Sequence, residues 1–237
     1  AQQLQQQQQQ QDEEASIIQY SRSGSGLSVN LVASSSQDND DATTVKVRYV
    51  VESPEAPLFI LSEHTMQLLL EQALPPAIAY SRWKRIYCLA RDGDDFGEFL
   101  RKCHSQQHTL LVVQTTLGEV FGGYVESPWT PHSDGFYGLG QACLFSCHHQ
   151  QRDGDGDAAL LQVYKWTGAN RYLQVCDATS RMICIGGGGD SFGICLEQDF
   201  SVGSTGPCDT FANAPLCRQE NFQVLNMEVY GFLLGQF

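Results

Sequence analysis

The sequence has no long apolar run and few basic residues. No stretch reaches the about 18 apolar residues that a membrane-spanning helix needs, so no membrane insertion is expected. Its 14 Lys and Arg are outnumbered by 27 Asp and Glu, which gives a net charge of −13. Nucleic acids and anionic membranes are bound by clustered cationic side chains, so neither is expected as a partner. The charge suits a soluble monomer that meets the basic surface of another protein.

The sequence also lacks the local cysteine motifs of redox and zinc sites. Its nine cysteines are odd in number and widely spaced, and no C-x-x-C occurs. Cys176, Cys184 and Cys195 fall within apolar runs, where a free cysteine behaves as a small buried hydrophobe. Because disulfides are rare in reducing compartments, this pattern favours an intracellular, cytoplasmic protein with free thiols.

Four consecutive glycines at residues 186–189 are the most informative local feature. A phosphate-binding loop would end in Gly-Lys-Ser/Thr, or would open a helix with G-x-G-x-x-G. Here Phe192, Ile194 and Leu196 follow instead, alternating with small or polar residues as in a strand. Glycine adopts positive φ freely, so the tract predicts a sharp turn between two strands.

The composition divides the chain into a tail and a domain. Residues 1–11 are glutamine-rich, and residues 21–41 are dominated by Ser, Gly, Asn and Asp. Such segments bury too little apolar surface to offset the entropy of ordering. We therefore expect a disordered Gln/Ser-rich tail at residues 1–45 and one domain at residues 46–237, with its core at residues 58–232.

Within the domain, two helices precede many short strands. Ser62 is a good N-cap for a helix that stops at Pro75-Pro76, and Asp95 caps a second helix. A hairpin is predicted around Leu117-Gly118, between strands at residues 110–114 and 120–124. This order indicates an α+β domain built on a β-sandwich. Further strands are expected at residues 43–51, 83–89, 142–147, 160–166, 172–176, 182–185, 192–196 and 224–232.

About ten short motifs between residues 58 and 232 occur in the order of a known domain family. Among them are Trp83-Lys84-Arg85-Ile86-Tyr87, Val163-Tyr164-Lys165-Trp166-Thr167-Gly168, the four glycines with Phe192-Gly193, and Met227-Glu228-Val229-Tyr230-Gly231-Phe232. Through these motifs the chain resembles the TLDc domain family. The resemblance implies a two-sheet antiparallel β-sandwich flanked by short helices. It also implies a non-enzymatic role in protection against oxidative stress, through binding and modulating the V-ATPase, with no cofactor.

The family pattern places glycines in separate loops at Gly93, Gly122, Gly168 and Gly188. With Asp95, which stands where the family usually has a serine, they are the candidate partner-binding residues. Thr205 also replaces a family serine, and residues 147–159 resemble an insertion.

Two clusters resemble metal sites without meeting their requirements. Cys143 and Cys147 would face one side of a strand and His148 the other, so with His149 they could reach one ion only if the chain folded back. Residues 153–157 alternate Asp and Gly like a calcium loop, but Ala158 and Tyr164 occupy the positions where an EF-hand needs glycine and glutamate. Core cysteines and a solvated acidic turn are expected, and no metal.

No nucleophile motif such as G-x-S-x-G occurs. Cys103, flanked by Lys102 and His104, is the best candidate for a peroxide-reactive thiol, although the negative end of a helix would raise its pKa. A cysteine-dependent peroxide-removing enzyme is therefore the alternative function. A scaffold whose glutamine-rich tail recruits other proteins is a third.

Overall fold

The computed structural model describes residues 20–22, 27–29, 45–131, 135–150, 158–197 and 199–233. The chain forms two compact units, Ala1–Thr43 with Val50–Glu55, and Thr44–Tyr49 with Ala56–Phe237. In the first unit, β1 (Tyr20–Arg22) pairs antiparallel with β2 (Leu27–Val29). Residues 1–19, 23–26 and 30–44 of the predicted tail lie outside the described part of the chain. Val45 belongs to the second unit, where its carbonyl accepts a hydrogen bond from Gln67 Nε2 at 2.9 Å.

Both predicted helices begin at the expected caps. Ser62 Oγ accepts the Thr65 N–H at 3.1 Å, and Asp95 Oδ1 accepts the Glu98 N–H at 2.7 Å. No helix in the described parts of the chain is long and apolar enough to span a membrane. The helices are α2 (Glu63–Gln72), the 3-10 turn η1 (Pro76–Ile78), α3 (Leu89–Asp92) and α4 (Phe96–Cys103).

The strands of the second unit form one continuous path of pairings. Its order is β8-β7-β6-β5-β13-β12-β11-β10-β9, and β4 also pairs with β13. All of these pairs are antiparallel, whereas the short β3 lies parallel to β4. The strands are β3 (Arg48–Tyr49), β4 (Arg82–Cys88), β5 (Thr109–Thr115), β6 (Val120–Val125), β7 (Cys143–Gln150), β8 (Ala158–Lys165), β9 (Gln174–Asp177), β10 (Met182–Ile185), β11 (Ile194–Leu196), β12 (Val202–Ser204) and β13 (Asn221–Leu233).

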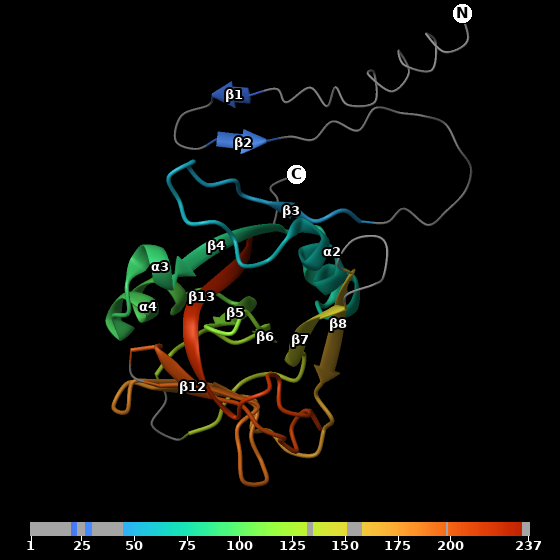
Figure 1. The fold of residues 1–237 in the computed structure, drawn as a ribbon, viewed down its shortest axis with the longest axis vertical. Helices are drawn as coiled ribbons and strands as arrows, with labels where there is room; N and C mark the ends of the chain where they lie inside the picture. The colour runs from blue at the N-terminus through green and yellow to red at the C-terminus, as the bar shows by residue number, and fades with distance from the viewer. Residues whose placement is uncertain are drawn as a thin grey trace, which may run out of the picture. The chain divides into compact units, whose positions relative to one another are not determined.

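The long strand β13 is shared by two sheets. Its first residues pair with β12, the following ones pair with β5, and from Glu228 onward β4 pairs along its other edge (Figure 1). Side chains of both sheets meet in the largest buried cluster, including Leu111 and Phe121 from one sheet and Ile183 and Ile194 from the other. The fold is thus α+β and sandwich-like, with short helices beside antiparallel sheets, as predicted.

Two further apolar layers cover the outer faces, because successive strand residues point to opposite sides. On the β4–β8 sheet, Leu110 and Val112 pack in a cluster with Met66 and Leu69 of α2. The outer face of the other sheet carries a much smaller buried cluster of Val175, Cys184 and Cys195.

The four glycines form the predicted turn between β10 and β11. Gly186, Gly188 and Gly189 have φ of 79°, 93° and 70°. A side chain on Gly187 would meet the Phe136 ring within 2.9 Å, so its absence lets this ring pack against the turn.

Candidate functional site

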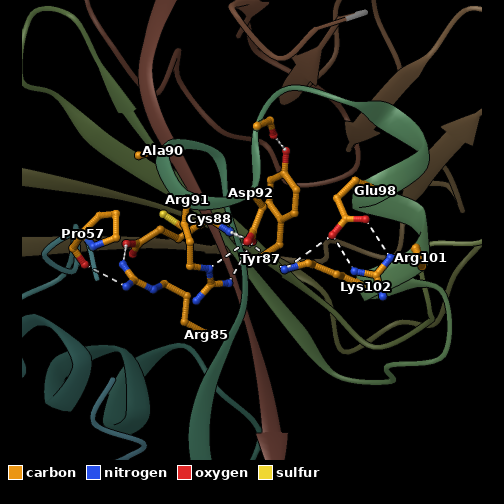
Figure 2. Close-up of polar contacts among 12 residues, drawn as sticks. Pro57, Arg85, Tyr87, Cys88, Ala90, Arg91, Asp92, Glu98, Arg101 and Lys102 are labelled. Atoms are coloured by element: carbon orange, nitrogen blue, oxygen red, sulfur yellow. Dashed lines mark hydrogen bonds and ion pairs between the residues drawn. The ribbon is translucent and has the colours of Figure 1, made fainter. Parts of the chain in front are cut away.

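The first group of candidate residues lies in the Asp92 loop, which we define as residues 89–95, between β4 and α4. Asp92 Oδ2 accepts the Cys88 N–H at 2.9 Å and lies 2.8 Å from Arg91 Nη2. Asp92 Oδ1 lies 2.7 Å from Lys102 Nζ of α4. Figure 2 shows the carboxylate between these two cations. One side chain therefore ties together β4, α3 and α4.

Two effects compete at the Asp92 carboxyl. Burial alone would raise its pKa, but hydrogen bonds from Arg91, Lys102 and the Cys88 N–H favour the charged form. The hydrogen bonds prevail and hold the pKa of Asp92 well below its usual range. The carboxylate is therefore a charged anchor for the loop at neutral pH.

Gly93 and Asp95 follow this anchor on the exposed side of the loop. Gly93 has φ of 80°, and its carbonyl accepts the Tyr87 hydroxyl at 2.6 Å. A side chain at Gly93 would meet no atom within 4 Å, so the left-handed backbone alone accounts for glycine here. Gly93, Asp94 and Asp95 are all exposed. The structure thus presents an acidic loop whose ends are held by Asp92 and by the Asp95 cap.

A second group forms around Thr210. This Thr210 cluster comprises residues 167–172, 186–189 and 209–211. The Thr210 hydroxyl donates to Asn170 Oδ1 at 2.7 Å and accepts the Gly187 N–H at 3.1 Å. The Thr210 carbonyl accepts the Thr167 N–H at 2.9 Å. Three loops that are distant in sequence are therefore joined through one threonine.

The Thr210 cluster contains two of the predicted residues, Gly168 and Gly188. Both have positive φ, 81° and 93°. A side chain at Gly188 would lie 2.9 Å from Asp209 Cβ and 2.7 Å from Asn170 Nδ2, whereas one at Gly168 would meet no atom within 4 Å. Close packing and the positive φ therefore both favour glycine at position 188, whereas the positive φ alone favours glycine at position 168.

The predicted loop position of Gly122 is wrong. Gly122 is buried in the middle of β6, paired with Val112 and Phe145 on its two sides. A side chain there would collide with the Leu111 carbonyl oxygen and lie 2.8 Å from the Phe145 ring. Glycine permits close packing inside the sheet at this position, so Gly122 has no exposed loop surface for a partner.

A buried ion pair was not anticipated from the sequence. Arg85 Nη1 of β4 lies 2.5 Å from Glu228 Oε1 of β13, and both side chains are fully buried. The remaining polar atoms hold the segment before α2: Arg85 Nη2 donates to the Pro57 carbonyl at 2.8 Å, and Glu228 Oε2 accepts the Ile60 N–H at 3.1 Å. The sequence does show one charged residue inside each apolar strand motif, Arg85 and Glu228. That the two residues pair depends on which strands are neighbours in the sheet, which the sequence does not show.

Tyr230 completes this pair, because its hydroxyl donates to Glu228 Oε2 at 2.6 Å. Burial, followed by the charge of Glu228, raises the pKa of Tyr230. The tyrosine is therefore a neutral donor. Together these groups form a buried clamp that holds residues 57–60 in place.

The candidate thiol and metal residues are placed in structural roles. Cys103 is fully buried in the main core, where burial raises the pKa of its thiol and Lys102 offsets this in part. Burial is the largest cause of this shift. Cys143 is also buried, and its thiol donates to the Ala73 carbonyl.

His148 Nε2 lies 3.1 Å from Ser146 Oγ on the same strand. The described residues include no group of three or more His, Cys, Asp or Glu that could hold a metal ion. The calcium-like residues 153–157 and the His149 side chain lie outside the described part of the chain.

Comparison with known proteins identifies the domain. The model of the TLDc domain matches residues 57–233. Human "Nuclear receptor coactivator 7" is 31% identical over 193 residues, covering 78% of this chain and 19% of that protein. Rat "Oxidation resistance protein 1" is 29% identical over 164 residues, covering 69% of this chain and 17% of the relative. The protein of that name from Cryptococcus neoformans is 27% identical over 179 residues, covering 69% of this chain and 36% of that protein. The chain thus corresponds to well under half the length of these relatives.

Proposed function

The chain belongs to the TLDc domain family, and from this premise we propose that it is a non-enzymatic protein-binding domain linked to protection against oxidative stress. Two of the relatives are named for oxidation resistance. The resemblance to the family further implies a cytoplasmic partner, the V-ATPase, whose assembly the domain modulates. The TLDc match over residues 57–233 supports the proposed role in protection against oxidative stress. The surface loops support the proposal that the domain binds its partner through them.

The exposed, anchored Asp92 loop is the observation that carries the proposal. Gly93, Asp94 and Asp95 face solvent, while Asp92 and Tyr87 hold the backbone from behind. A loop already held in one conformation loses little entropy on binding. Its carboxylates suit a basic surface on the partner, in line with the net charge of −13. We therefore assign the first partner contact to this loop.

The Thr210 cluster offers a second contact surface. Gly168 is exposed and Gly188 partly so, and their loops are joined by hydrogen bonds through Thr210. Tyr172, beside this network, is 46% exposed and stacks on Phe136 with ring centroids 4.7 Å apart. Partly exposed aromatic side chains are common anchors at protein interfaces. Gly122 is not part of either surface, because it is buried in β6.

The burial of Cys103 weighs against the peroxide-enzyme alternative. A cysteine that removes peroxide catalytically needs an exposed thiolate stabilised by positive charge. Cys103 is fully buried, and its pKa is raised. We therefore give this residue a packing role within the proposed binding domain.

Charge reversal in the Asp92 loop tests the proposal. Asp94→Lys changes an exposed residue that neither caps α4 nor joins the Asp92 hydrogen bonds, so the fold should be retained. We expect it to weaken co-precipitation of V-ATPase subunits at least about fivefold, or roughly 1 kcal/mol. Glu220→Lys, another exposed acidic position, is the matched control for the change in net charge.

Circular dichroism melts of both variants establish that they remain folded. The proposal fails if wild-type protein does not co-precipitate the pump. The assignment to the Asp92 loop fails if Glu220→Lys weakens binding as much as Asp94→Lys does.

A further inference from the structure

Cys184 and Cys195 lie directly opposite each other on neighbouring strands. The antiparallel register pairs Cys184 of β10 with Cys195 of β11. Residues paired in this way have Cα atoms about 4.5–5.5 Å apart, within the about 4.4–6.8 Å that a disulfide spans. Their side chains share one face of the sheet, and Cys184 Sγ lies 2.7 Å from Cys195 Sγ. Two thiols are therefore held within bonding reach by the strand register.

No other two cysteines are register partners among the described strands. Cys176 on the adjacent strand β9 is paired with Ile183, and it belongs to the core between the sheets. Cys184 and Cys195 belong instead to the small cluster on the outer face. The sheet thus separates this pair from Cys176.

The pair is buried beneath a thin cover. Cys184 is 0% and Cys195 2% exposed. The side chains packed against their cluster are those of Phe136, Met182 and Phe192, all only partly buried. Because so little apolar area covers the pair, local opening of this layer admits a small oxidant more readily than opening of the main core.

We propose that Cys184 and Cys195 form an intramolecular disulfide when the protein meets hydrogen peroxide. One thiol loses its proton, and its sulfur attacks a peroxide oxygen. The O–O bond breaks, hydroxide leaves and takes up a proton, and a sulfenic acid remains. The second sulfur then attacks the sulfenic sulfur, so that an S–S bond forms and the hydroxyl group leaves as water. In total, two thiols and one peroxide give one disulfide and two waters.

This reaction is a single oxidation of the protein, without turnover. Burial, with a smaller effect of the neighbouring thiol, raises the pKa of Cys184, so the reactive thiolate forms when the cover opens. The bond would close a loop from residue 184 to residue 195 that contains all four consecutive glycines. Such a cross-link restricts the unfolded chain and should raise the Tm by about 5–10 °C.

Peptide mapping of the full chain tests the proposal directly. Reduced protein is treated with hydrogen peroxide, free thiols are alkylated, and the chain is digested without reduction by trypsin and a protease that cleaves before Asp. Cleavage before Asp190 separates the two cysteines into residues 182–189 and residues 190–198. We expect these two peptides to be recovered joined, with a mass two hydrogens below their sum, and to separate on reduction.

Cysteine variants supply the controls. Cys184→Ser and Cys195→Ser should each abolish the joined peptide and the rise in Tm, whereas Cys176→Ser should retain both. If a serine variant does not fold, Cys184→Val replaces the buried thiol with an apolar side chain. Alkylated Cys184 and Cys195 after peroxide treatment of folded protein would overturn the proposal. So would a disulfide from Cys184 to Cys208, which the digest places in a different peptide.

Discussion

Replacing Glu228 with glutamine measures how strongly the buried ion pair stabilises the fold. Glu228 Oε1 lies 2.5 Å from Arg85 Nη1, and water reaches neither side chain. Glutamine keeps the size of the side chain and an oxygen that can accept the Ile60 N–H, but it removes the negative charge. The substitution therefore withdraws the Glu228 charge from a buried guanidinium while leaving the packing nearly unchanged.

The expected loss follows from the cost of disrupting such a pair. Removing one partner of a buried ion pair costs about 3–5 kcal/mol, because the other charge stays buried. For a domain of this size the Tm should fall by about 6–20 °C. The double variant Arg85→Met/Glu228→Leu removes both charges, but it also removes hydrogen bonds to residues 57–60. Each backbone group left unsatisfied costs about 1–3 kcal/mol, so this variant should also be less stable than wild type.

Urea unfolding followed by circular dichroism provides the free energies. The two charge removals should be non-additive: Arg85→Met/Glu228→Leu should be less destabilised than the sum of the single variants Arg85→Met and Glu228→Leu. Arg101→Ala disrupts the exposed pair with Glu98 and should leave the midpoint almost unchanged. A loss below about 1 kcal/mol for Glu228→Gln, at an unchanged slope of the free energy against urea, would refute the reasoning.

Three further predictions concern packing, pH and the tail. Gly122→Ala should cost about 2–3 kcal/mol because its methyl group collides with the Leu111 carbonyl, against about 1 kcal/mol for Gly93→Ala; equal urea midpoints for the two variants would contradict this. The pKa of Asp92 is lowered on folding, so its stabilisation is fully present above the unfolded pKa of about 3.9 and is lost as pH falls further. The difference in free energy of unfolding between wild type and Asp92→Asn should therefore be constant from about pH 5 to 8 and shrink below about pH 4. A difference that grows in acid would contradict the lowered pKa of Asp92. Removing residues 1–43 should change the Tm by less than about 4 °C, and a larger drop in a thermal melt would show that the tail stabilises the domain.

Much of the secondary structure follows from local sequence. Ser62 and Asp95 cap their helices through contacts three residues away, so neighbours in the sequence suffice to place them. The turn at residues 186–189 follows in the same way from glycine alone. The one-turn helix α3 and the three-residue strand β12 were not predicted, because neither is long enough to show a period.

The candidate site is predictable only in part. Gly93 and Asp95 share a loop because they are neighbours in the chain, and this was visible in the sequence. The convergence of Gly168 and Gly188 was not, since Thr210 joins their loops from 40 residues beyond Asn170 and 23 beyond Gly187. The family pattern places Gly122 in a loop, although the strand predicted at residues 120–124 contains it. Its role is set by the Leu111 carbonyl and the Phe145 ring on adjacent strands.

The sequence by itself therefore determined the α+β class, the helix caps, the glycine turn and the acidic character of the exposed loop. Tertiary structure alone decided that Arg85 meets Glu228, 143 positions away, that Cys103 is buried, and that Cys184 faces Cys195. The physical reason is strand register. Capping and turn formation are settled by hydrogen bonds and backbone angles within a few residues. The partner of a strand residue is chosen by the packing of the whole sheet, and a shift of one residue would turn every side chain to the other face.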